Sequence, residues 1–170
     1  TTAGYNTAVG SSALATDTLG ARNVAIGMNT LQAQNFTTAS DSYNTAVGYA
    51  AGTANTTGTH NTFIGGLAGD ANTTGGNNTA VGMQALSANT TASNNDAFGY
   101  RALTTNTTGT ENTALGRDAM YANTTGDRNV AVGYGALDAN TTASNNTAIG
   151  NNALTANTTG AQNTAVGKAA

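Results

Sequence analysis

The sequence predicts an all-β protein, a parallel β-solenoid or β-roll that makes one coil per 17-residue repeat. Three observations predict it: a constant repeat period, two short apolar segments in each repeat, and Gly and Asn at constant places between them. Helical repeats need about 33 residues for two helices and their turns, so a 17-residue unit is too short for them. Stacked coils would pair each strand with its copy at a rise of about 4.8 Å, and ten coils would form a rod of about 45–50 Å.

The motif Asn-x-(Ala/Phe)-apolar-Gly sets the register of one repeat array that covers residues 1–170. A partial unit, 1–5, precedes full units that start at residues 6, 23, 44, 61, 78, 95, 112, 129 and 146, and a partial unit, 163–170, follows them. The interval is 17 residues except from Asn23 to Asn44, where it is 21, so we expect a corner insertion near residues 35–42. Counted from its Asn, the consensus reads NTAVGxxALxANTTGxx.

Composition excludes several classes of function. Only 8% of the residues are charged while 38% are hydrophobic, which favours a repetitive fold of small side chains over a disordered chain. The net charge is −3 with only five basic residues, too few for a phosphate-binding track, so no nucleic-acid partner is expected. No apolar run reaches membrane length, so no membrane insertion is expected. The chain has no Cys, and no cofactor or metal is expected.

The first and fifth positions of the repeat are Asn and Gly in all ten copies of the motif, and we expect both to form corners. Gly suits a corner that needs a positive φ or a close approach of backbones. Stacked Asn side chains can hydrogen-bond from coil to coil through their amides. The sequence therefore predicts amide ladders along the rod.

One irregular repeat indicates which side chains point inward. Position three is Ala except at Phe63, and position nine is Gly instead of Leu or Met only at Gly52 and Gly69. These two glycines lie in the coil of Phe63 and in the coil before it, which suggests that the ring fills the space of two missing side chains in one dense core. Positions three and nine are therefore predicted to be interior, and position four should point to the opposite face because strand side chains alternate.

Position four is apolar in every copy, so an outward orientation would leave an apolar stripe along the rod. A continuous stripe of this kind signals an interface, and we predict that chains pack these stripes together, three around a common axis. The residues of this apolar stripe are Val9, Ile26, Val47, Ile64, Val81, Phe98, Leu115, Val132, Ile149 and Val166.

Two stretches, NVAIG at 23–27 and NVAVG at 129–133, resemble the YadA-like and haemagglutinin-type head repeats of trimeric autotransporter adhesins. Those repeats are typically shorter than 17 residues and build a left-handed parallel β-roll in a trimer. The full unit NTAVGxxALxANTTGxx is similar to arrays in phage-type tail-fibre proteins and bacterial tail-fibre-domain surface proteins, over essentially the whole chain. The resemblance implies a trimeric extracellular fibre shaft or adhesin without catalysis.

Seven repeats carry Asn-Thr-Thr, which is formally an N-glycosylation sequon. The same residues are typical of turns, because Asn and Thr side chains hydrogen-bond to their own backbone, and this is the favoured interpretation. Glycan decoration is the alternative. The seven residues are Asn55, Asn72, Asn89, Asn106, Asn123, Asn140 and Asn157, and further sequons begin at Asn35, Asn77 and Asn145.

No catalytic or metal site is predicted. His60 is the sole His and is expected to face solvent at a corner, and the eight acids occupy different repeat positions without general acid/base or calcium-loop spacing. The variable positions six, seven and ten are expected to be exposed, either to keep the rod soluble or to form sugar-stacking or protein-contact patches. Their distinctive residues are Tyr49, Tyr100, Arg101, Arg117, Asp118, Tyr121 and Tyr134.

The predicted function is therefore mechanical: the shaft of an extracellular fibre at a cell surface or on a virion, non-catalytic, with adhesive contacts to cell-surface glycans or receptors. The alternative is a self-assembling, glycosylated extracellular filament. A remote alternative is an ice-binding solenoid, in which Thr columns would order water. Against it, neighbouring Thr residues on a strand point to opposite faces.

Overall fold

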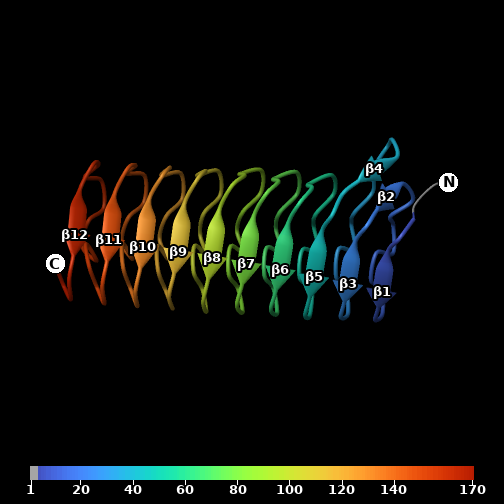
Figure 1. The fold of residues 1–170 in the computed structure, drawn as a ribbon, viewed down its shortest axis with the longest axis horizontal. Coiled ribbons are helices and arrows are strands. Elements are labelled where there is room, and N and C mark those ends of the chain that lie inside the picture. The colour runs from blue at the N-terminus through green and yellow to red at the C-terminus, as the bar shows by residue number, and fades with distance from the viewer. Residues whose placement is uncertain (1–3) are drawn as a thin grey trace.

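The computed structural model describes residues 4–170 and is a rod of stacked coils with the two ends of the chain at opposite ends of the rod (Figure 1). Its described residues form short strands and turns and no helix. The strands are β1 (Thr7–Val9), β2 (Gly20–Ala21), β3 (Val24–Ile26), β4 (Ser40–Asp41), β5 (Thr45–Val47), β6 (Thr62–Ile64), β7 (Thr79–Val81), β8 (Asp96–Phe98), β9 (Thr113–Leu115), β10 (Val130–Val132), β11 (Thr147–Ile149) and β12 (Thr164–Val166).

Ten of these strands form one parallel sheet, in the order β1-β3-β5-β6-β7-β8-β9-β10-β11-β12. Each strand is made of positions two to four of one repeat and pairs with the same positions of the next, as in Ala80 with Ala97 and Val81 with Phe98. Equal positions pair in register across every interval, including the 21-residue one between β3 and β5. The predicted fold class, a parallel β-solenoid with one coil per 17-residue repeat, is confirmed.

The additional residues of the 21-residue coil leave the outline of the rod at a corner. The short pair β2 and β4 lies there, and Figure 1 shows the loop at β4 projecting beyond the neighbouring coils. Within the loop, Phe36 is only 7% exposed. The regular path resumes at Ser42, whose Oγ donates to the Asn23 Oδ1 (2.8 Å). A bulge at one corner therefore leaves the stacking of the other coils intact.

The core is a column of small and branched side chains from positions three, eight and nine. In the coil that starts at residue 78, Ala80, Ala85 and Leu86 are all completely buried, and the same positions are buried in the other inner coils. The prediction that positions three and nine are interior is confirmed. The core is thin, because most of its residues are Ala.

Phe63 occupies the core space of two missing side chains, as the sequence suggested. The ring is completely buried. A Cβ added at Gly52 would lie 2.7 Å from the Phe63 Cδ2, and one added at Gly69 would lie 2.5 Å from the Phe63 Cδ1. Neither distance is sterically tolerable, so both glycines are required by the ring.

Each coil turns through residues in the left-handed backbone region, which the sequence analysis identified only at position five. Besides the glycine at position five, such as Gly82 (φ 137°), positions seven, nine and seventeen have positive φ, as in Gln84 (58°), Leu86 (54°) and Asn94 (61°). β-branched residues are strongly disfavoured there. None of the described residues at these three positions is Val, Ile or Thr. The choice of Leu or Met for the core at position nine follows from this backbone.

Two ladders of hydrogen-bonded Asn side chains run along the rod, one formed by the asparagines at position one and the other by the asparagines at position twelve. At position one, the Asn95 backbone N–H donates to the Asn78 Oδ1 (3.0 Å) and the Asn95 Nδ2 donates to the Gly109 carbonyl (2.9 Å). At position twelve, the Asn89 Nδ2 donates both to the Asn72 Oδ1 (2.7 Å) and to its own turn (Ala92 carbonyl, 3.0 Å). The predicted amide ladders are therefore present, and their buried amides satisfy the corner backbone.

Candidate binding surfaces

The apolar residues at position four lie outside the coil. Several are well exposed, including Ile26 (40%), Phe98 (38%) and Leu115 (49%), while Val47, Val81 and Val132 are half-buried. Because they occupy the same place in every strand of the ten-stranded sheet and pair in register, they form one row along the strand face of the rod. The apolar stripe is thus a surface of this chain, and its contact with another chain stays a prediction.

The structure corrects the candidate glycosylation sites at position twelve. Asn55, Asn72, Asn89, Asn106, Asn123 and Asn140 are completely buried, and Asn157 is half-buried. A glycan would be attached at the side-chain nitrogen, but the Asn123 Nδ2 already donates to the Asn106 Oδ1 (2.8 Å) and to the Gly126 carbonyl (3.1 Å). This folded corner has no room for a sugar. At position twelve Asn-Thr-Thr therefore forms a hydrogen-bonded turn. The asparagines of the other three sequons, Asn35, Asn77 and Asn145, are exposed.

The Thr residues that follow these asparagines form a third ladder. The Thr73 Oγ1 donates to the Thr90 carbonyl (2.9 Å), and the Thr107 Oγ1 donates to the Thr124 carbonyl (3.0 Å). In the first six of these turns only the next residue, such as Thr74 or Thr108, is exposed, whereas in the last turn both Thr158 and Thr159 are exposed. Every Asn-Thr-Thr turn before the last one therefore presents one exposed Thr, and these residues form a single column along the rod.

Two columns of alternating Tyr and Arg lie on the surface, and neither was predicted from the sequence. Tyr100, Arg117 and Tyr134 occupy position six in three consecutive coils, and the Arg117 Cζ lies 5.6 and 5.7 Å from the two ring centroids. Such distances allow cation–π attraction on both sides of the guanidinium. The sequence contains the information needed to predict this column, because Tyr, Arg and Tyr occupy the same repeat position in successive units.

The second column lies near the N-terminus at the last position of the repeat. The Arg22 Cζ lies 5.4 Å from the Tyr5 ring centroid and 5.5 Å from that of Tyr43. Arg22 also pairs with Asp41, and the Tyr43 ring stacks on His60 with centroids 5.4 Å apart. His60 is exposed, as expected, and takes part in this stack.

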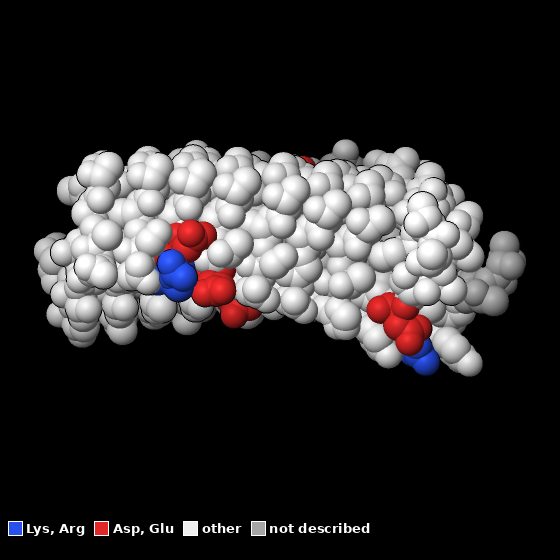
Figure 2. All heavy atoms as spheres, turned by 90° about the horizontal axis from the view of Figure 1, so that it is seen from above, with Lys and Arg blue, Asp and Glu red and all other residues white. Residues whose placement is uncertain are grey.

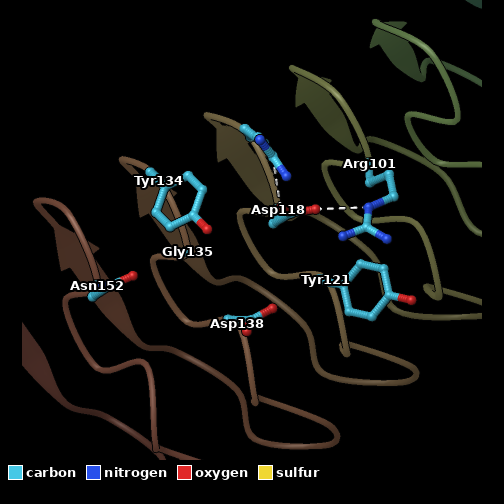
Figure 3. Close-up of a pocket in the computed structure, with 8 residues that line it drawn as sticks. Arg101, Asp118, Tyr121, Tyr134, Gly135, Asp138 and Asn152 are labelled. Carbon is cyan, nitrogen blue, oxygen red and sulfur yellow. Dashed lines mark hydrogen bonds and ion pairs between the residues drawn. The ribbon is translucent and has the colours of Figure 1, made fainter.

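A hollow of about 460 Å³ opens beside the Tyr100–Arg117–Tyr134 column (Figure 3). Gly135 lines it at position seven, where the neighbouring coils carry the side chains of Asp118 and Asn152, and a Cβ at Gly135 would lie 2.5 Å from the Asn152 Oδ1. Figure 3 shows the labelled side chains arranged around this common space, with Tyr134 and Tyr121 on different sides of it. Its lining residues are Arg101, Arg117, Asp118, Tyr121, Tyr134, Gly135, Asp138 and Asn152.

The two carboxylates at this hollow have different environments. Asp118 is only 9% exposed and is held by the Arg101 Nε (2.8 Å from Oδ1) and the Arg117 Nε (3.1 Å from Oδ2). Asp138 is half-buried, and in the part of the chain that the structure describes no donor hydrogen-bonds its carboxylate. Burial raises the pKa of Asp138, the negative charge of Asp118 raises it further, and Arg101 opposes this.

The structure brings together most of the residues singled out at the variable positions. Arg101, Arg117, Asp118, Tyr121 and Tyr134 all line the hollow, while Tyr49 lies elsewhere on the rod. The expectation that these positions are exposed is wrong for Asp118, which the two arginines cover. Asp138, Gly135 and Asn152 were not identified from the sequence as residues of one site, because they share this space only through the way that positions seven and ten lie beside each other in the folded coil.

The rest of the surface offers little charge. The face seen in Figure 2 is largely uncharged, and most of its charged side chains gather in two separate groups. Among residues 4–170, no three His, Asp or Glu side chains lie close enough together to hold a metal ion. Nor does that part of the chain contain a helix long and apolar enough to cross a membrane. Comparisons with protein-family models, with curated proteins and with solved structures find no significant match.

Proposed function

We propose that this chain is a segment of the shaft of an extracellular fibre, at a cell surface or on a virion, in which three copies pack through the apolar stripe. The role is mechanical and non-catalytic: to hold a rigid rod at a set length. The observation that carries the proposal is the stripe itself, one apolar side chain per coil on the outer face of the whole sheet, exposed in most coils and half-buried in three.

Sheet physics supports a partner on this face. Parallel sheets are generally covered on both faces, and here the inner face packs on the core while the outer face carries Ile64, Phe98 and Leu115 at 38–49% exposure. A partner must match a row that repeats once per coil. A second and third copy of this chain have that same period by construction, so a cyclic trimer can bury every coil's apolar side chain in an equivalent place.

The hydrogen-bonded ladders support a mechanical role. Each coil joins the next through backbone hydrogen bonds at several places around its circumference and through the Asn ladders at positions one and twelve. The stability of such arrays is roughly a sum of equal terms from neighbouring coils, so an added coil can be stabilised by the same contacts as the coils before it. A rod of this kind has a length set by its repeat number.

Sedimentation equilibrium together with negative-stain electron microscopy tests the proposal. The unaltered chain is expected to be a trimer that appears as short rods. The double variant Ile64→Asp/Phe98→Asp is expected to sediment as a monomer with an unchanged circular dichroism spectrum, because it buries a charge at each stripe contact. The matched control is Thr74→Asp/Thr108→Asp, which adds the same two charges to exposed positions of the same coils and should remain trimeric.

Three outcomes contradict the proposal. If the unaltered chain is still a monomer at about 100 µM, a concentration well above the dissociation constants of specific protein complexes, then the proposed interface between chains does not form. A stripe variant that stays trimeric places the contact elsewhere on the chain. Long filaments instead of short rods favour the alternative of a self-assembling filament.

A further inference from the structure

The hollow beside Gly135 has the size and lining of a small-molecule site. Its volume of about 460 Å³ lies within the range of ligand pockets. The hollow is formed within one chain, by consecutive coils. It therefore does not depend on chain association.

The charges at the hollow disfavour an ionic ligand. Two arginines and two aspartates balance one another. Both oxygens of Asp118 are already engaged by Arg101 and Arg117, so they are not free to bind a cation. An anion would meet the unpaired carboxylate of Asp138, which lies at the same space (Figure 3).

The remaining groups suit a ligand with many hydroxyls and an apolar ring face. The Asp138 carboxylate is an acceptor without a donor among the described residues, so a ligand hydroxyl can supply one. The Asn152 amide can both donate and accept. Tyr121 and Tyr134 add aromatic surface from two different coils, on which C–H groups of a sugar ring can pack.

We propose that this hollow binds one neutral pyranose residue of a glycan. Asp138 accepts hydrogen bonds from the sugar hydroxyls, Asn152 contacts the same edge of the ring, and Tyr121 and Tyr134 pack against its C–H groups from different sides. The Arg101–Asp118–Arg117 cluster keeps the wall of the hollow rigid. The site goes beyond the mechanical role proposed above and would supply the adhesive contacts to glycans that the sequence predicts, and its ligand chemistry stands independently of the trimer.

Saturation-transfer NMR and calorimetry on the full chain test this site with methyl glycosides of glucose, galactose, mannose and N-acetylglucosamine. We expect at least one to bind with a dissociation constant in the millimolar range, about what a single small pocket contact supports. Asp138→Asn removes the acceptor charge and is expected to weaken binding about tenfold. Gly135→Gln adds at position seven a side chain that this position accepts at Gln84. Its Cβ would lie 2.5 Å from the Asn152 Oδ1, so the variant displaces the Asn152 contact as well as filling the hollow, and it is expected to abolish binding.

Matched controls separate loss of the site from loss of the fold. Asp70→Asn makes the same change at position ten of a distant coil, and Gly66→Gln adds the same side chain at a glycine whose Cβ would meet no atom within 4 Å. Both controls should bind the sugar like the unaltered chain, and all variants should keep its circular dichroism spectrum. A variant that loses this spectrum is replaced by Asn152→Ala, which should weaken sugar binding in a folded chain.

The proposal is overturned if none of the four glycosides binds at about 50 mM, well above a millimolar dissociation constant. It is equally overturned if sialic acid or Ca²⁺ binds at the hollow while the neutral sugars do not, since that assigns an ionic ligand class. Binding that survives Gly135→Gln places the sugar elsewhere. None of these outcomes changes the sedimentation result, so failure of the sugar site and failure of the trimer are distinguishable.

Discussion

Leu115, on the strand side of one coil, is 49% exposed, whereas Leu103, on the turn side of the preceding coil, is completely buried. The strand side consists of positions two to four and the turn side of positions six to eleven. Leu115 lies in β9 with an extended backbone, and Leu103 has a φ of 53°. The same side chain therefore serves as outer surface in one place and as core in the other, and the backbone conformation decides between them.

This difference explains the residue choice at each place. On the strand side, position four accepts Val, Ile, Phe and Leu, because an extended backbone tolerates branching at Cβ. On the turn side, position nine is restricted to Leu, Met and Gly, because a left-handed backbone disfavours β-branched residues. Positions four and nine are both apolar in the sequence, but a different steric rule limits the choice of side chain at each of them.

The largest expected effect comes from the residue that joins the two sides. The backbone of Phe63 belongs to the strand side, at position three, and its ring fills the core space beside Gly52 and Gly69 on the turn side. Phe63→Ala is expected to lower the unfolding free energy by about 3–5 kcal/mol, because it leaves a large core cavity. Urea denaturation followed by circular dichroism measures this loss.

A compensating variant sharpens that test. Adding Gly52→Leu and Gly69→Leu to Phe63→Ala restores the consensus of the other coils and is expected to recover most of the lost stability. Either leucine in the presence of Phe63 should be destabilising, because its Cβ would overlap the ring. A triple variant no more stable than Phe63→Ala would show that these positions do not share one space.

A smaller effect is expected at the corner where the turn side returns to the strand side. The Asn95 Oδ1 accepts the Asn112 backbone N–H (3.0 Å), and its Nδ2 donates to the Gly109 carbonyl (2.9 Å). Asn95→Ala leaves the buried Asn112 N–H without a partner, while the Gly109 carbonyl keeps the Asn106 Nδ2 as a donor (2.8 Å), and it is expected to destabilise the chain by about 1–3 kcal/mol. Thermal unfolding compares it with Asn151→Ala, an exposed Asn that should change little. Equal melting temperatures for the two variants would contradict a structural role of the ladder.

The smallest effect tests the two steric rules directly, with one substitution at two leucines. Leu103→Ile places a β-branched residue at a φ of 53° and is expected to cost about 1–2 kcal/mol of stability. Leu115→Ile, in β9, is expected to stay within about 0.5 kcal/mol, since strands accept Ile well. Denaturant midpoints of the two variants measure the difference. Indistinguishable midpoints would mean that the turn relaxes around the branched side chain.

Much of the fold was predictable because the 17-residue period makes stacked neighbours of residues that share a repeat position. The coil, the register, the insertion at the corner and the core positions three and nine all follow from that period and from one volume exchange at Phe63. The left-handed turns at Gln84, Leu86 and Asn94 were not predicted, because a Gln or a Leu carries no visible turn signal and only the closed path of the coil forces its φ.

The candidate sites were less predictable for a related reason. The sequence Asn-Thr-Thr is the same whether its Asn is exposed or buried. Only the stacked corner shows that the Asn123 Nδ2 donates its hydrogen bonds to Asn106 and Gly126. The Tyr100–Arg117–Tyr134 column could have been found by aligning the repeats, because the three residues share position six. The hollow could not, because it depends on columns seven and ten lying side by side.

The sequence by itself determined the period, the corners, the interior columns and the outward apolar stripe, because each of these is a relation between a residue and its own copies one coil away. The tertiary structure decided which different columns become neighbours around the coil. That is set by the turns at positions seven, nine and seventeen, whose angles no single repeat displays. It places Asp138 beside Asp118, leaves a hollow at Gly135, and buries the asparagines that the sequence offered as glycan sites.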